Sequence, residues 1–200
     1  DFVLGARNIS KIKDVVDVKG SVEISIDNDE SMYEFSTAKT NQYRASVNIS
    51  VGCDKKCTYC IVPSTRGEEI SIPPEMIIEQ VRKSVALGAV EVTLLGQNVN
   101  SYGRNFSDGR GKYTFTNLLQ DVSKIEGLER IRFTSPHPLH MGDDFIEEFA
   151  KNPKISKCIH MPLQSGSTSI LRAMKRGYTK EWFLNRAAKL RALVPNLRIT

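Results

Sequence analysis

From residue 45 onward, short runs that mix apolar and polar residues, such as the alternating run 45–51, are separated by stretches of helical periodicity. These runs predict four strands, at 45–51, 90–95, 129–133 and 157–161, and residues 197–199 open a fifth. Apolar residues at helical spacing predict the helices between and after these strands, at 74–87, 116–125, 143–150, 167–175 and 179–193. Strands that alternate with helices indicate parallel strands joined by right-handed crossovers, as a barrel or an open sheet. The pattern therefore predicts an α/β fold.

The first 44 residues show a weaker pattern. A short strand is expected at 2–5 and a helix over 8–19, with Gly20 as its stop. Residues 21–44 are polar, with brief alternation at 22–26 and 33–35, and we expect a linker with some extended structure. The strand and helix of residues 1–20 are expected to be the tail of a preceding domain. The chain begins without methionine and stops inside a predicted strand, so we expect a piece of a longer protein.

Composition narrows the class of protein. Two hundred residues, 40% of them hydrophobic, suit one compact domain, or one domain and a fragment of another. No apolar run approaches the roughly 18 residues of a membrane helix, and no signal peptide is recognisable. Four cysteines, three of them clustered, do not suit a secreted disulfide framework, so a cytoplasmic protein is expected. A net charge of +5 permits a nucleic-acid partner without requiring one.

The clustered cysteines are the strongest chemical signal. Cys53, Cys57 and Cys60 lie within eight residues, in a loop that leaves the first predicted strand. Thiolates bind zinc and iron–sulfur clusters, but a structural zinc site needs four ligands and no fourth lies nearby. Three thiolates on a [4Fe-4S] cluster leave one iron open to a small molecule, and Lys55 and Lys56 are expected to favour the thiolate forms. The alternatives are a zinc site completed by a distant histidine and three free thiols.

Polar residues also follow the other predicted strands. They are Gly96-Gln97-Asn98 after the second strand, Thr134-Ser135-Pro136-His137 after the third and Gln164-Ser165-Gly166 after the fourth. The carboxyl ends of parallel strands share one edge of the sheet, where such folds build their sites. We therefore expect these residues and the cysteine loop to form one site.

The cysteine octet, with Tyr59 before its last cysteine, resembles the signature of the radical S-adenosylmethionine (SAM) enzymes. Residues 47–53 and 60–69 resemble the methylthiotransferase branch, and residues 94–102 resemble its tRNA-modifying members. The resemblance covers about residues 45–200 and implies a partial, TIM-like radical SAM barrel, truncated at its fifth strand. It also implies a [4Fe-4S] cluster on the three cysteines, with SAM on the open iron. The residues expected to contact SAM are Tyr59, Gly96, Gln97, Asn98, Gln164 and Ser165.

The same resemblance implies the reaction and the partners. Reductive cleavage of SAM would give a 5′-deoxyadenosyl radical, and a methylthio group would enter at C2 of N6-isopentenyladenosine beside the anticodon of tRNA. A second [4Fe-4S] cluster is expected in the preceding N-terminal domain, and the electron donor is expected to be flavodoxin- or ferredoxin-like. We expect a monomer, and we expect the fragment alone to be inactive in methylthiolation.

Other functions remain open at this point. One alternative is action on threonylcarbamoyladenosine or on a ribosomal-protein aspartate. Others are a non-catalytic electron carrier, with Cys158 as a fourth ligand, and a zinc-stabilised RNA-binding module. For Cys158 we favour a buried, small hydrophobic role.

Several further residues have both a structural and a functional interpretation. Gly96 also suits a tight turn, and Gln164-Ser165-Gly166 also suits a helix cap. Arg66 and Arg176 are expected to be solvated, and metal binding by His137 and His140 is not favoured. Basic and aromatic residues interleave in a loop that suits unstacked nucleotides, or else a solvated loop, and they are Tyr102, Arg104, Phe106, Arg110, Lys112, Tyr113 and Phe115.

Overall fold

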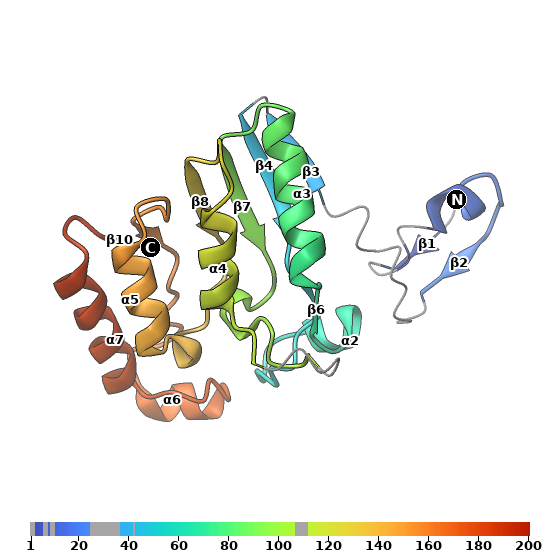
Figure 1. The fold of residues 1–200 in the computed structure, drawn as a ribbon. Helices are drawn as coiled ribbons and strands as arrows, with labels where there is room; N and C mark the ends of the chain where they lie inside the picture. The colour runs from blue at the N-terminus through green and yellow to red at the C-terminus, as the bar shows by residue number, and fades with distance from the viewer. Residues whose placement is uncertain (1–2, 6–7, 9–10, 25–36, 42, 107–111) are drawn as a thin grey trace.

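The computed structural model describes residues 3–5, 8, 11–24, 37–41, 43–106 and 112–200 (Figure 1). A four-stranded sheet forms its centre, in the order β3 (Thr37–Asn41), β4 (Arg44–Asn48), β7 (Glu91–Leu95) and β8 (Arg130–Phe133). Strands β4, β7 and β8 are parallel, whereas β3 runs antiparallel to β4. Parallel strands in sequence order confirm the predicted arrangement of the first three strands.

Beyond β8, the sheet is extended by a single bridge rather than by a full strand pair. Ile131 of β8 forms a parallel bridge with Ile155, just before β9 (Cys158–Ile159). Strand β9 then pairs in parallel with β10 (Arg198–Ile199). The fourth and fifth predicted strands are therefore present and parallel, although each is only two residues long.

The helices cover one face of this sheet (Figure 1). They are α3 (Pro74–Ala86), α4 (Phe115–Ser123), α5 (Asp143–Lys151) and α7 (Lys180–Leu193), whereas the short α6 (Thr168–Ala173) lies at the lower edge of the molecule (Figure 1). Helix α3 begins with a proline, whose missing N–H costs nothing at that position. Thr114 and Asn117 form a capping box at the start of α4. All five helices were predicted to within about two residues at each end.

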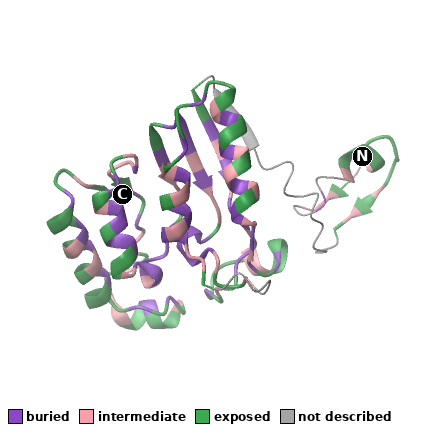
Figure 2. Ribbon diagram, in the orientation of Figure 1, coloured by how far each residue is buried: buried purple, intermediate pink, exposed green. Residues whose placement is uncertain are grey.

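The hydrophobic core lies between the helices and the covered face of the sheet (Figure 2). Side chains alternate along a strand, so Val47, Val92 and Ile131 point under the helices and are buried. Leu118 and Phe149 bring the helices into the same cluster. The intervening strand residues, such as Ser46 and Thr93, are only half-buried on the other face.

The expected strand over 45–51 is two strands. The chain changes partner at Ile49, whose amide donates to the carbonyl of Leu95 and whose carbonyl accepts from Ile72. Beyond that point, β5 (Ser50–Val51) pairs antiparallel with β6 (Ile70–Ser71). This small ladder closes the base of the cysteine loop, which also carries α2 (Val62–Arg66). Two 3-10 turns, η3 (Val99–Ser101) and η4 (Pro138–His140), follow β7 and β8.

The N-terminal segment pairs β1 (Val3–Leu4) with β2 (Val22–Glu23) in parallel. A helix was expected over 8–19, but α1 (Ile12–Val15) spans only four residues, so the predicted helix was too long. None of its residues is buried, so packing does not support a longer helix. Strands β2 and β3 supply the extended structure expected in 21–44, whereas residues 25–26 and 33–35 lie outside the described residues. The division of the chain into domains remains a prediction.

The described residues contain no helix that is both long and apolar enough to cross a membrane.

A buried carboxylate joins three strands of the sheet. The Glu91 side chain is 5% exposed and forms ion pairs with Arg44 of β4 at 3.3 Å and with Arg130 and Arg132 of β8 at 3.1 Å each. We predict that Glu91→Gln lowers the free energy of unfolding by about 1–3 kcal/mol, because three arginines lose their shared counter-charge. Urea denaturation measures this effect. The exposed Glu126→Gln should change stability by less than about 0.5 kcal/mol, and equal midpoints for the two variants would contradict the prediction.

Candidate functional site

The cysteine loop is held in place by hydrogen bonds to two other segments of the chain. The amide of Cys53 donates to the carbonyl of Gly67 at 3.1 Å, and the amide of Thr58 donates to the carbonyl of Met174 at 3.3 Å. The Thr58 hydroxyl also donates to the carbonyl of Ala173 at 3.3 Å. Residues 173 and 174 end α6, so the loop rests on a helix more than a hundred residues later in the chain.

Asp54, inside the loop, ties it to a second neighbour. Its carboxylate accepts hydrogen bonds from the amide of Glu69 at 2.8 Å and from the side chain of Asn105 at 2.7 Å. The loop is therefore connected to the segment that follows β7 as well as to α6.

The three clustered cysteines line one cavity of about 200 Å³. Cys53 and Cys57 are buried, Cys60 is exposed, and all three are free thiols. The other walls come from the ends of β7, β8 and β9, as expected for the carboxyl edge of a parallel sheet. The predicted residues Gln97, Asn98 and Gln164 are among them, so the structure brings four segments together as the sequence indicated.

Tyr59 reaches this group through a hydrogen bond. Its hydroxyl donates to the side-chain carbonyl of Gln164 at 3.1 Å. Gln164 has a φ of +69° and Ser135, also on the cavity wall, a φ of +52°. Left-handed backbone is uncommon for residues other than glycine and is concentrated at functional sites.

Three of the predicted residues, Tyr59, Gly96 and Ser165, do not line this cavity. Gly96 lies in the wall of a neighbouring cavity, beside Ser50 and Arg66. A Cβ at position 96 would come within 2.5 Å of the Ser50 hydroxyl, so close packing requires glycine there. The Ser165 hydroxyl accepts from the amide of Ser167 at 3.1 Å, in the turn that begins α6. This is the local structural role that the sequence had offered as its alternative.

Arg176 is a site residue that the sequence interpretation missed. We expected it to be solvated, but it is only 9% exposed. Its Nη1 lies 3.2 Å from the sulfur of Cys57 and 3.4 Å from the Tyr59 hydroxyl. No local pattern indicated a buried position, because the Cys57 and Tyr59 contacts of Arg176 come from the cysteine loop, more than a hundred residues earlier in the chain. Arg66, by contrast, is exposed as expected.

Burial governs the protonation of the site. It raises the pKa of the Cys53 thiol, even though a hydrogen bond from the Lys55 backbone acts in the opposite direction. For Cys53, burial thus outweighs any effect of the neighbouring lysines, and the expectation that Lys55 and Lys56 favour the thiolate forms stays a prediction. Burial, followed by the positive charges of Arg176 and Lys55, lowers the pKa of His137 to about 3. Its imidazole is neutral across the physiological range.

Several buried polar atoms on the cavity wall lack partners among the described residues. They are both side-chain amide atoms of Asn98, Nε2 of His137 and Nε of Arg176. Leaving such atoms unpaired is costly, so their convergence indicates a polar ligand. Three thiols, a guanidinium and an unpaired amide on one wall fit an iron–sulfur cluster that carries a small polar chelate.

A single-ion site has less support from the geometry. Within the described part of the chain, no group of three or more His, Cys, Asp or Glu side chains could hold one metal ion. Thiolates of a cluster need not converge in this way, because each binds a different iron. Cys158 is exposed on β9 and is not part of the cavity wall, so the expectation that it is buried is wrong.

Comparison with known families agrees with this donor set. The model of the radical SAM superfamily matches residues 47–200. The chain belongs to the radical SAM superfamily. Solved radical SAM structures share the fold: TsrM, a methyltransferase from Kitasatospora setae, matches 76% of this chain and 29% of its own length, with a TM-score of 0.59 and 15% identity. The cobalamin-dependent enzyme OxsB matches 80% of this chain and 24% of its own, with a TM-score of 0.60 and 16% identity.

These fold matches confirm the predicted partial radical SAM barrel. Curated relatives are similar over the whole chain. The tRNA-2-methylthio-N(6)-dimethylallyladenosine synthase of Aliarcobacter butzleri is 89% identical over 200 residues, and that of Nitratiruptor is 66% identical over 199. The chain spans 46% of the length of each, about half.

Cluster binding provides the first test of the site. Anaerobic reconstitution with iron and sulfide should load about four irons per chain, and serine at position 53, 57 or 60 should abolish this loading. Cys158→Ser is the matched control and should load normally, because it is not on the cavity wall. Iron and sulfide analysis with absorbance spectra measures the outcome. Full loading of Cys57→Ser, or tightly bound zinc in place of iron, would contradict the assignment.

Arg176 provides a second test. Its guanidinium donates to the Cys57 sulfur and brings a positive charge, and both features favour the reduced cluster. Arg176→Gln should lower the reduction potential by roughly 60 mV for each 1.4 kcal/mol of interaction lost, without loss of iron. Potentiometric titration followed by electron paramagnetic resonance measures the shift. Arg172→Gln, an exposed change on α6, is the control, and equal shifts in both variants would show that Arg176 acts only through general charge.

Proposed function

We propose that this chain is the radical SAM core of a tRNA methylthiotransferase that acts at C2 of N6-isopentenyladenosine, beside the anticodon. The observation that carries the proposal is the cavity in which Cys53, Cys57 and Cys60 meet the loops of three other strands. The names of the curated relatives supply the substrate, since the isopentenyl group of N6-isopentenyladenosine is a dimethylallyl group.

The residues of the cavity have distinct proposed roles. Cys53, Cys57 and Cys60 hold a [4Fe-4S] cluster with one open iron, and when bound it supplies the electron for reductive cleavage of SAM. Asn98 has two unpartnered amide atoms within the described chain, which suit the amino and carboxylate groups of SAM.

The remaining predicted residues support this arrangement. Gln97 and Gln164 lie on the same wall, and Tyr59 orients Gln164 through its hydroxyl. Gly96 and Ser165 remain predicted SAM contacts. Each also shapes its loop, because Gly96 lies against Ser50 and Ser165 accepts a hydrogen bond from the α6 turn.

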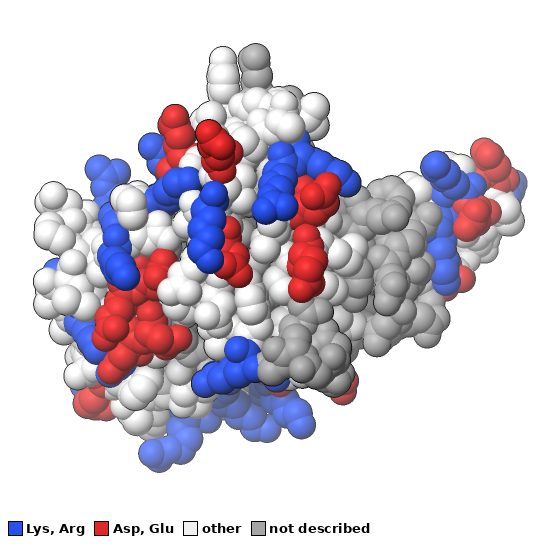
Figure 3. All heavy atoms as spheres, viewed as in Figure 1, with Lys and Arg blue, Asp and Glu red and all other residues white. Residues whose placement is uncertain are grey.

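The proposed partners are tRNA and a flavodoxin- or ferredoxin-like electron donor, in the cytoplasm, with the protein as a monomer. Basic side chains gather along the lower edge of the molecule, and acidic ones gather over α5 (Figure 3). The carboxyl ends of the strands point to that lower edge (Figure 1). Positive charge there favours the approach of an RNA backbone to the rim that holds the site. A second [4Fe-4S] cluster, in a domain outside this chain, is the proposed counterpart in sulfur insertion.

Product analysis tests the proposal. The full-length protein, reconstituted and given SAM, reductant and isopentenyladenosine-containing tRNA, should form the methylthio nucleoside, detected by mass spectrometry of digested tRNA. Cys57→Ala should abolish the product, while residues 1–200 alone should form none, because only three clustered cysteines are present for one cluster. If the protein instead modified threonylcarbamoyladenosine or a ribosomal aspartate, the substrate assignment would be wrong, but the proposed radical reaction would stand. A loaded cluster with no SAM binding by the full-length protein would favour an electron carrier.

A further inference from the structure

A second and larger cavity lies on the same rim, outside the three-thiol cavity. Its volume is about 490 Å³, which is within the usual range for small-molecule sites. It opens between the loop after β7, the η4 turn and the first residues of α4 and α5. The cysteines and the predicted SAM-contact residues are not on its wall, so the site described above does not account for it.

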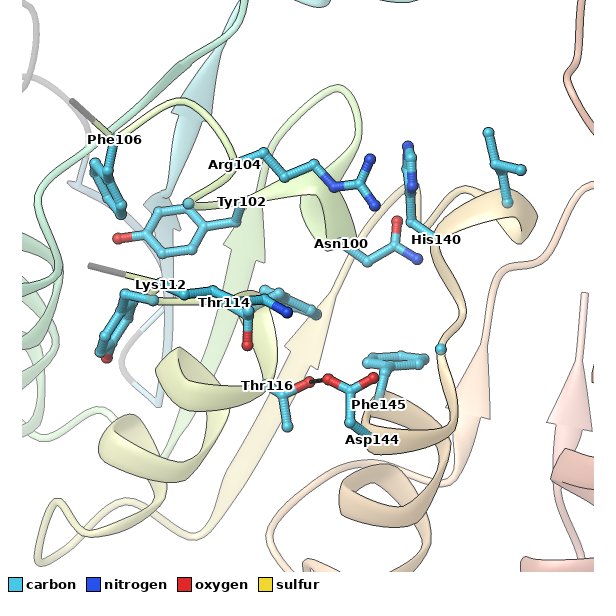
Figure 4. A pocket seen from close by; sticks show the side chains of 15 residues that line it. Asn100, Tyr102, Arg104, Phe106, Lys112, Thr114, Thr116, His140, Asp144 and Phe145 are labelled. Carbon is cyan, nitrogen blue, oxygen red and sulfur yellow. Dashed lines mark hydrogen bonds between the residues drawn. The ribbon is translucent and has the colours of Figure 1, made fainter. Parts of the chain in front are cut away.

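One part of this cavity is basic. The side chains of Arg104 and Lys112 extend into it, and the His140 ring stands beside the Arg104 guanidinium (Figure 4). His140 is 9% exposed, and its Nε2 has no hydrogen-bond partner among the described residues. Burial, followed by the charges of Lys55 and Arg104, lowers the pKa of His140 to about 3, so the ring is neutral. Two cations beside a neutral ring favour an anionic group, such as a phosphate.

The opposite part of the cavity carries a carboxylate. Asp144 accepts a hydrogen bond from the Thr116 hydroxyl at 2.9 Å (Figure 4). Because one oxygen is held by Thr116, the group is oriented and can accept another donor from a ligand. A bound molecule should therefore carry an anion at one end and a hydroxyl or amine at the other.

Aromatic rings form the side wall. Phe106 and Tyr113 are half-buried and lie edge-on to the buried Tyr102, with ring centroids 5.5 Å and 6.4 Å away. Gly103 makes this arrangement possible, since a Cβ there would come within 1.9 Å of the Tyr113 carbonyl oxygen. A planar base can stack on such a wall. Arg110, which the sequence placed in the same basic loop, lies outside the described residues.

We propose that this cavity binds one nucleotide of the RNA substrate, with its phosphate at Arg104 and Lys112, its base against Phe106 and a ribose hydroxyl or exocyclic amine at Asp144. Anion, planar ring and donor occur together in a nucleotide, which matches all three parts of the wall. That the nucleotide belongs to RNA rests on the proposed function. That the cavity suits a nucleotide rests only on its wall. The site would hold an RNA nucleotide that lies near the target adenosine, while the adenosine itself enters the three-thiol cavity.

The test uses the reconstituted full-length protein, an anticodon stem–loop RNA and free AMP. Arg104→Gln and Lys112→Gln should each weaken RNA binding about 5- to 10-fold and reduce the slope of log affinity against log salt by about 1. Phe106→Leu should weaken binding several-fold with no change of slope, because it removes stacking and no charge. Arg82→Gln, an exposed change on α3, is the control for lost positive charge and should alter neither quantity. Thermal unfolding and iron content confirm that each variant folds.

The outcomes separate this proposal from the proposed function. Unchanged affinity and slope in Arg104→Gln, Lys112→Gln and Phe106→Leu, in a protein that methylthiolates tRNA, would overturn the nucleotide site alone. Arg104-dependent AMP binding, in a protein that does not modify tRNA, would support a site for a free nucleotide and overturn the function. Weakened RNA binding without measurable AMP binding supports an RNA-only site.

Discussion

The site depends on contact between two segments far apart in the chain. The cysteine loop rests on the end of α6 through hydrogen bonds from Thr58 to the carbonyls of Ala173 and Met174. Arg176, two residues further on, places its guanidinium 3.2 Å from the Cys57 sulfur across a sequence separation of 119 residues. A loop with three thiols has little structure of its own, because its backbone groups find few partners within it. Folding of the later βα units therefore completes the cavity.

The same contact explains how a mostly neutral cavity can hold negatively charged ligands. Burial disfavours the thiolate of Cys53 and the charged form of His137 alike. Arg176 stays charged under these conditions, because a guanidinium is not deprotonated in proteins. A cluster with thiolate ligands would bring negative charge into this space, and Arg176 is the buried cation placed against it. Burial disfavours a free thiolate in this cavity, while the positive charge of Arg176 favours thiolates that are bound to a cluster.

Sequence periodicity predicted most of the fold because local patterns record which face of an element is buried. The strands and five helices followed from alternation and helical spacing, and the cysteines followed from ligand chemistry. The change of partner at Ile49 could not be predicted, since apolar and polar residues alternate without a break over 45–51 and pairing is a non-local property. Arg176 was missed for a related reason: its burial depends on the cysteine loop. Cys158 was assigned to the interior from its residue type, yet it lies on the exposed face of a two-residue strand.

The two cavities on the rim share a wall, and that wall is built from one reciprocal contact. The Asn100 side chain donates to the carbonyl of His137 at 3.0 Å and accepts from the amide of His137 at 2.7 Å, which joins η3 to η4. His137 then faces the three-thiol cavity, while His140, one turn later, faces the larger one. Both rings are neutral at physiological pH, so the wall adds no charge between Arg176 on one side and Arg104 on the other. Each cation can therefore act on the ligand in its own cavity, while Asn100 fixes the separation of the two sites.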